Sequence, residues 1–173
     1  MNGMNGMNDM GGSGPPFYGK YRGKVTDNDD PNGLGRIRVK VQDVLGDQES
    51  GWALPATPYA GDGVGLYLIP PKDAFVWVEF EHGDPDYPIW TGCFWLSQST
   101  VPKEASGPDI KLLKTSIATI TIDDSDSGSS ITIEKNGLKI VMDTNGIEIS
   151  NGDNKITLSD ASVSVNDGAL EVT

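Results

Sequence analysis

Pairs of aliphatic residues separated by one residue recur through the last third of the chain. Seven pairs lie between residues 117 and 173, at steps of 11, 9, 7, 9, 7 and 7 residues. Asn-Gly and Asp-Gly dipeptides, which are typical turn sequences, lie between several of them. The pattern predicts seven very short strands, each with one apolar face. The apolar positions are Ile120, Ile122, Ile131, Ile133, Ile140, Met142, Ile147, Ile149, Ile156, Leu158, Val163, Val165, Leu170 and Val172.

These pairs are too sparse to make a core within one chain. A strand of about four residues offers two apolar side chains on one face, and no aromatic residue follows Trp95. Three chains forming a prism would join their apolar faces on a narrow axis and pair strand edges between chains. Seven strands per face would span on the order of 35 Å. We therefore expect residues 117–173 to form an intertwined triple-stranded β-helix, or needle, in a homotrimer. A monomeric solenoid and an open β-sheet are the alternatives.

Short strands separated by turns are also predicted for residues 17–96. Polar and apolar residues alternate in the first two, which a segment rich in Asp and Asn connects. The five predicted strands cover residues 18–26, 36–41, 65–69, 74–81 and 89–95. Five short strands in about 80 residues favour an OB-like barrel. The expected fold class is all-β, with residues 97–116 as a linker between barrel and needle.

The N-terminal segment has a different composition. Asn, Gly and Met dominate residues 1–16, which can bury too little apolar area to offset the entropy of ordering. We expect a flexible tail, which could instead order against a partner. The segment lacks the basic-then-apolar pattern of a signal peptide, so synthesis in the cytoplasm is expected. No apolar run approaches the 18 residues of a membrane-spanning helix.

Charge and composition narrow the function classes. The 173 residues carry a formal charge of -12, which argues against nucleic-acid binding and against docking on an anionic membrane. One cysteine excludes an intrachain disulfide and a CxxC site. One histidine excludes a two-histidine zinc site and leaves little room for a catalytic triad. We expect no catalytic residue, no metal and no cofactor.

A basic face stands out in this acidic chain. Six residues at alternate positions of the first two predicted strands form it: Lys20, Arg22, Lys24, Arg36, Arg38 and Lys40. It could dock an acidic hub protein or a neighbouring protomer. The alternative is an outer barrel face neutralised across strands by Glu79 and Glu81.

Other polar and aromatic features have simpler explanations. The spacing of Asp123, Ser125, Ser127, Gly128 and Glu134 resembles a calcium loop, but serines replace two ligands, so a turn is expected. We expect His82 to stabilise a turn through a hydrogen bond, and Cys93 to be a small core residue. The aromatic residues Trp77, Phe80, Trp90, Phe94 and Trp95 could stack bases, but barrel core is the simpler role.

Several segments together resemble one family. They are Gly-Lys-Tyr-Arg-Gly-Lys-Val-Thr (19–26), Gly-Arg-Ile-Arg-Val-Lys-Val (35–41), Gly-Trp-Ala-Leu-Pro-Ala-Thr-Pro-Tyr-Ala-Gly (51–61) and Val-Trp-Val-Glu-Phe-Glu-His-Gly-Asp-Pro-Asp-Tyr-Pro-Ile-Trp-Thr-Gly-Cys-Phe-Trp (76–95). They look like the OB domain of the phage baseplate assembly protein V and VgrG spike family. Members carry a trimeric β-helical needle after this domain, where the aliphatic pairs lie here.

The resemblance implies a structural central spike in the baseplate of a contractile tail or injection machine. It would puncture the target envelope and touch the target membrane transiently. Because only a tail precedes the barrel, the hub would be a separate protein. A small PAAR-type protein would cap the C-terminal end, and the His-x-His iron apex of some spikes is missing.

Two other functions remain as alternatives. An OB-type module with a β-repeat stalk could bind oligosaccharide or nucleic acid. A hydrolase could use the carboxylates Asp27, Asp29 and Asp30, although that acidic segment fits a loop better.

Overall fold

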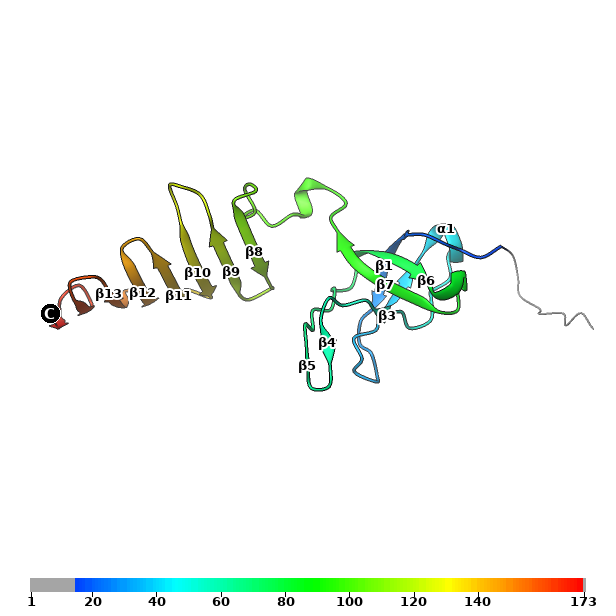
Figure 1. The fold of residues 1–173 in the computed structure, drawn as a ribbon, viewed down its shortest axis with the longest axis horizontal. Helices are drawn as coiled ribbons and strands as arrows, with labels where there is room; N and C mark the ends of the chain where they lie inside the picture. The colour runs from blue at the N-terminus through cyan, green and yellow to red at the C-terminus, as the bar shows by residue number, and fades with distance from the viewer. Residues whose placement is uncertain (1–14, 173) are drawn as a thin grey trace, which may run out of the picture. The chain divides into compact units, whose positions relative to one another are not determined.

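The computed structural model describes residues 15–172, which fall into two units that divide after Leu96 (Figure 1). Most of the expected N-terminal tail lies outside the described residues. The regular secondary structure of both units is nearly all β-strand. The short helices are α1 (Gln42–Leu45), η1 (Glu81–Gly83) and η2 (Gln98–Thr100). No helix in the described part of the chain has the length and apolarity to span a membrane.

The first unit contains a curled five-stranded sheet with the order β2-β1-β6-β7-β3 (Figure 1). All neighbouring strands are antiparallel except β3 and β7. The strands are β1 (Tyr21–Asp27), β2 (Arg38–Lys40), β3 (Leu54–Pro55), β6 (Phe75–Phe80) and β7 (Pro88–Phe94). This sheet confirms the predicted OB-like barrel.

Alternation along the strands builds the barrel core. Val76, Val78 and Phe80 point inward from β6, and Val25 points inward from β1. Trp90 closes the core, and its indole N–H donates to the Gly35 carbonyl at 3.2 Å. The whole buried set is Val25, Ile37, Val39, Val41, Ala53, Val76, Val78, Phe80 and Trp90. Apolar residues at every second position therefore fill the core of this sheet.

The predicted third barrel strand, residues 65–69, is wrong. Leu54–Pro55 supplies the fifth strand of the sheet instead. Only the start of the predicted segment is extended, in the hairpin of β4 (Ala60–Gly61) with β5 (Val64–Gly65). Leu66, Tyr67 and Leu68 do not alternate with polar residues, so no face is marked for burial, and the structure leaves all three exposed.

The second unit is one antiparallel sheet in which each strand pairs with the next along the chain. Its strands are β8 (Ile110–Lys114), β9 (Thr119–Asp123), β10 (Ser130–Lys135), β11 (Leu138–Asp143), β12 (Gly146–Asn151), β13 (Asn154–Leu158), β14 (Val163–Val165) and β15 (Leu170–Val172). At about 4.8 Å per strand, the sheet spans roughly 34 Å.

The structure corrects one sequence expectation for this unit and adds a detail to another. Residues 110–114, expected as linker, form strand β8, so the described sheet has eight strands and not seven. The strands also pair with their neighbours within one chain, and pairing of strand edges between chains stays a prediction. The reason for the pairing within one chain is that turns such as Asn136-Gly137, with φ of 50° and 86°, connect neighbouring strands tightly enough to pair them directly.

Candidate trimer-forming surface and barrel contacts

All fourteen predicted needle residues lie on one face of the second sheet, which we call the apolar face. Cross-strand register aligns them in two rows. The first row is Ile122, Ile131, Met142, Ile147, Leu158, Val163 and Val172. The second row is Ile120, Ile133, Ile140, Ile149, Ile156, Val165 and Leu170. Register thus turns seven separate pairs into one continuous aliphatic surface.

The apolar face is uncovered in a single chain. Twelve of its fourteen side chains are 37–62% exposed. Covering a half-exposed aliphatic side chain regains about half of its transfer free energy, so the set is worth on the order of 10 kcal/mol per chain. The opposite face carries residues such as Thr121, Thr132 and Glu148. A surface this large and this apolar needs a partner.

Strand β8 adds one apolar and one charged residue to the ends of the two rows. Leu113 lies opposite Ile120 and continues the second row, while Lys111 lies opposite Ile122 and ends the first. The Lys111 ammonium is 2.5 Å from a carboxylate oxygen of Asp124. The uncharged stretch of the first row therefore begins at Ile122.

Close backbone approach determines one residue of the sheet. Gly146 begins β12 with φ of 129°, and a Cβ there would lie 2.0 Å from the Leu158 carbonyl oxygen. Only glycine fits this position. In the turn dipeptide Asn145-Gly146, the glycine is therefore required because β12 packs closely against the end of β13.

Most of the predicted basic face is ion-paired within its own unit. Lys20 lies 2.8 Å from Glu79, Lys24 2.7 Å from Asp73, Arg38 2.9 Å from Glu49, and Arg36 2.6 Å from Asp30. Among the described residues, Arg22 and Lys40 take part in no ion pair of this kind. The Arg22 guanidinium lies over the Phe94 ring, 6.0 Å from its centroid.

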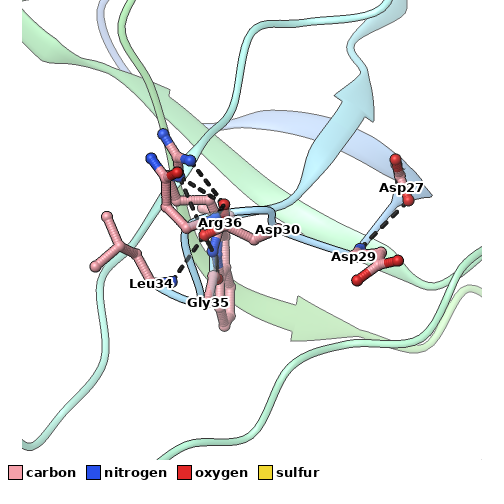
Figure 2. Close-up of polar contacts among 8 residues, drawn as sticks. Asp27, Asp29, Asp30, Leu34, Gly35 and Arg36 are labelled. Carbon is pink, nitrogen blue, oxygen red and sulfur yellow. Dashed lines mark hydrogen bonds and ion pairs between the residues drawn. The ribbon is translucent and has the colours of Figure 1, made fainter.

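The acidic segment between β1 and β2 is a structural loop held by Asp30 (Figure 2). Its carboxylate accepts the backbone N–H groups of Asn32, Leu34 and Arg36 at 3.0, 2.8 and 3.2 Å. It also accepts the Arg36 guanidinium, which, together with the amides, holds the pKa of Asp30 well below its usual range. This carboxylate is fully engaged and is not available as a general base.

Of the other two candidate carboxylates, that of Asp27 is also engaged, whereas the Asp29 side chain is exposed. Asp27 pairs with Lys72 at 2.9 Å. Its carboxylate also accepts the backbone N–H of Asp29 at 3.3 Å (Figure 2). These contacts lower the pKa of Asp27, the Lys72 hydrogen bond most of all. The contacts of Asp27 and Asp30 therefore fit the loop role that was expected for this acidic segment.

One contact was not expected from the sequence. Arg36 and Arg38 both lie over the Trp52 ring, 5.6 and 5.0 Å from its centroid. No sequence pattern pairs residues this far apart. These cation–π contacts connect the Asp30 loop to the segment that enters β3.

For the calcium-like segment the structure confirms the expected turn, whereas for His82 it does not show the expected hydrogen bond. The calcium-like segment is a turn between β9 and β10, in which Asp123 accepts the Ser125 backbone N–H at 2.9 Å. The turn at His82 is held by the Asp84 N–H bonded to the Glu81 carbonyl at 3.0 Å, while the imidazole is 92% exposed. The expected hydrogen bond from His82 is thus wrong.

Cys93 is exposed and is not a core residue, which corrects the sequence expectation. The buried positions of β7 stop at Trp90, and the strand is irregular opposite Val76–Val78. Partial burial still raises the pKa of the Cys93 thiol.

Two of the five candidate aromatic residues, Phe80 and Trp90, are core residues as predicted. Trp77 and Phe94 are partly exposed and pack on each other at 4.6 Å between ring centroids. Trp95 is 63% exposed. The five rings therefore do not form one stacking platform.

Comparison with known proteins matches both units. Residues 21–95 match the type VI secretion system/phage-baseplate injector OB domain, and residues 110–171 match the phage baseplate V C-terminal trimerisation domain. In Pseudomonas aeruginosa PAO1, the type VI secretion system spike protein VgrG4b is 38% identical over 74 residues, which is 40% of this chain. The spike protein VgrG5 is 42% identical over 73 residues, or 39% of this chain. Each match spans 9% of the relative. The chain belongs to the phage baseplate V and VgrG spike family, with its OB domain followed by its trimerisation domain.

Proposed function

We propose that this protein is the structural central spike of a contractile tail or injection machine and acts as a homotrimer. The observation that carries the proposal is the apolar face. Its two rows of aliphatic residues stay uncovered in one chain, although each described strand pairs with its neighbour. Three such faces turned inward would bury one another, and the match to a trimerisation domain supports this arrangement.

The proposed action is mechanical. Contraction of a sheath supplies the force, and the needle transmits it to the envelope of the target cell, with transient contact to its membrane. Backbone hydrogen bonds connect each strand from β8 to β15 to the next. In the proposed trimer, the apolar faces buried on the axis would hold the three sheets together. No catalytic step is needed. The engagement of Asp30 and Asp27 in loop contacts supports a role without hydrolysis.

We further propose a separate hub protein as the partner of the barrel. Lys20, Lys24, Arg36 and Arg38 are neutralised by carboxylates of their own unit. Arg22 and Lys40 are therefore the better candidates for an acidic hub surface.

A PAAR-type tip protein is the partner we propose at β15. Leu170 and Val172 are 61% and 62% exposed there, more than the rest of the apolar face. A small protein that covers this end would remove that exposed apolar surface from water.

Light scattering of the full chain tests the needle. A trimer that resists SDS or heat is expected, and a monomer would overturn the proposal. For the hub, binding of the baseplate hub protein should weaken in Arg22→Glu/Lys40→Glu and persist in the exposed-lysine control Lys103→Glu. Equal binding by both variants would remove the hub contact from the proposal.

A further inference from the structure

The barrel carries an apolar surface that the spike proposal does not use. It surrounds the β4–β5 hairpin, which projects from the barrel sheet (Figure 1). Six large side chains there are 46–67% exposed, and we call them the hairpin patch: Leu34, Tyr59, Val64, Leu66, Tyr67 and Leu68. A groove at the base of the hairpin is lined by several of them together with Pro55 and Ile69.

The hairpin presents this surface in a fixed shape. The Leu66 N–H donates to the Tyr59 carbonyl at 2.8 Å, and the Thr57 hydroxyl donates to the Leu66 carbonyl at 3.0 Å. Gly63 has φ of 68° in the tight Asp62-Gly63 turn. The apolar side chains are therefore held outward on a backbone that is already ordered, which lowers the entropic cost of binding.

Charge distinguishes this surface from the rest of the barrel. Residues 51–71 contain one charged residue, Asp62, whereas 22% of the chain is charged. Residues 15–96 carry 7 basic and 12 acidic residues, a net charge of -5. Barrels of like charge repel one another, so they can meet at lowest electrostatic cost through the hairpin patch.

Tethering favours another copy of the same chain as the occupant. Fifteen residues separate the end of β7 from the start of β8. Such a segment spans at most roughly 50 Å. In a trimer it would hold three barrels at an effective concentration on the order of millimolar. At that concentration even a weak apolar contact is occupied.

We propose that the hairpin patches of three copies contact one another about the three-fold axis and join the barrels into a collar. This inference rests on the proposed trimer. It assigns the hairpin patch to contact between copies of this chain, and not to a hub, a tip or a membrane.

Disulfide trapping in the full chain tests it, in a Cys93→Ser background that removes the native thiol. Tyr67→Cys should form an interchain disulfide under mild oxidation. Because one bond uses two of three thiols around an axis, at most about two thirds of the chains should run as dimers on denaturing gels. The matched control Tyr87→Cys replaces another tyrosine, 61% exposed and outside the hairpin patch, and should stay unlinked.

Light scattering of the same samples separates the two proposals. A monomer would overturn the trimer itself. A trimer in which the Tyr67→Cys thiol is unlinked and alkylated as fast as the Tyr87→Cys thiol would overturn the collar alone. Val64→Cys, at the hairpin tip, provides a second trapping position if Tyr67→Cys does not fold.

Discussion

The Arg36 guanidinium lies 2.6 Å from the Asp30 carboxylate, and the two side chains are only 18% and 3% exposed. The pair closes the loop between β1 and β2. Through Trp52, the same arginine also contacts the segment that leads into β3. The Asp30 carboxylate therefore holds the loop between β1 and β2 directly, and it positions the arginine that contacts Trp52.

Asp30→Asn should lower the midpoint of thermal unfolding of the barrel by several degrees. The substitution removes the charge that Arg36 faces and weakens the acceptor for three backbone N–H groups. Circular dichroism melting measures the effect. Asp29→Asn is the matched control, because Asp29 is exposed and its own carboxylate makes none of these contacts. Equal midpoints for the two variants would contradict the structural role of Asp30.

Acid should destabilise the barrel through the same group. A carboxylate whose folded-state pKa is lowered stabilises the protein above the unfolded-state pKa, about 3.9 for aspartate. That contribution is lost as pH falls from about 4 towards the lowered pKa. Urea unfolding between pH 6 and pH 3 should show a stability loss that is smaller in Asp30→Asn than in the native chain. An identical pH dependence in both would contradict this assignment.

Ile133→Lys should abolish the trimer at micromolar concentration. Ile133 lies in the second row of the apolar face, so the substitution would bury three ammonium groups without partners, each at a cost of several kcal/mol. Thr132→Lys places the same side chain on the opposite face and should remain trimeric. Analytical ultracentrifugation distinguishes the two. Trimers of both variants would show that the apolar face is not the interface.

Gly146→Ala should disrupt the needle sheet. The added Cβ would lie 2.0 Å from the Leu158 carbonyl oxygen, so β12 and β13 must separate locally, at a cost above about 1 kcal/mol. Gly152→Ala is the control, since its φ of 60° is also positive but no heavy atom lies within 4 Å of the added Cβ. The melting temperature of the trimer should drop in the first variant and change less in the second.

A chain that ends at residue 109 should lose most of its tendency to trimerise. Such a chain retains the barrel and the hairpin patch but lacks β8 to β15 and the whole apolar face. Light scattering should show a monomer, or a weak association that depends on concentration. A stable trimer of this shortened chain would move the main interface to the barrel.

Side-chain patterns predicted the faces of the strands well. Alternation placed Val76, Val78 and Phe80 in the barrel core, and it placed every one of the fourteen needle residues on a single face. The physical reason is local. Successive side chains of a strand point to opposite sides, so a period of two identifies the buried side wherever the strand pairs.

Backbone pairing was decided by the tertiary structure. Leu54–Pro55 pairs with β7 in the barrel sheet, although no alternation of polar and apolar residues predicts a strand there. Residues 65–69 are mostly apolar, but they are exposed and lie outside the barrel sheet. The sequence pattern also did not predict that Cys93 is exposed or that the needle strands pair within one chain. The sequence by itself determined which side chains share a face, because that is a property of each strand. Which strands hydrogen-bond to which depends on backbone groups that are alike in every residue except proline, so only the folded structure decided it.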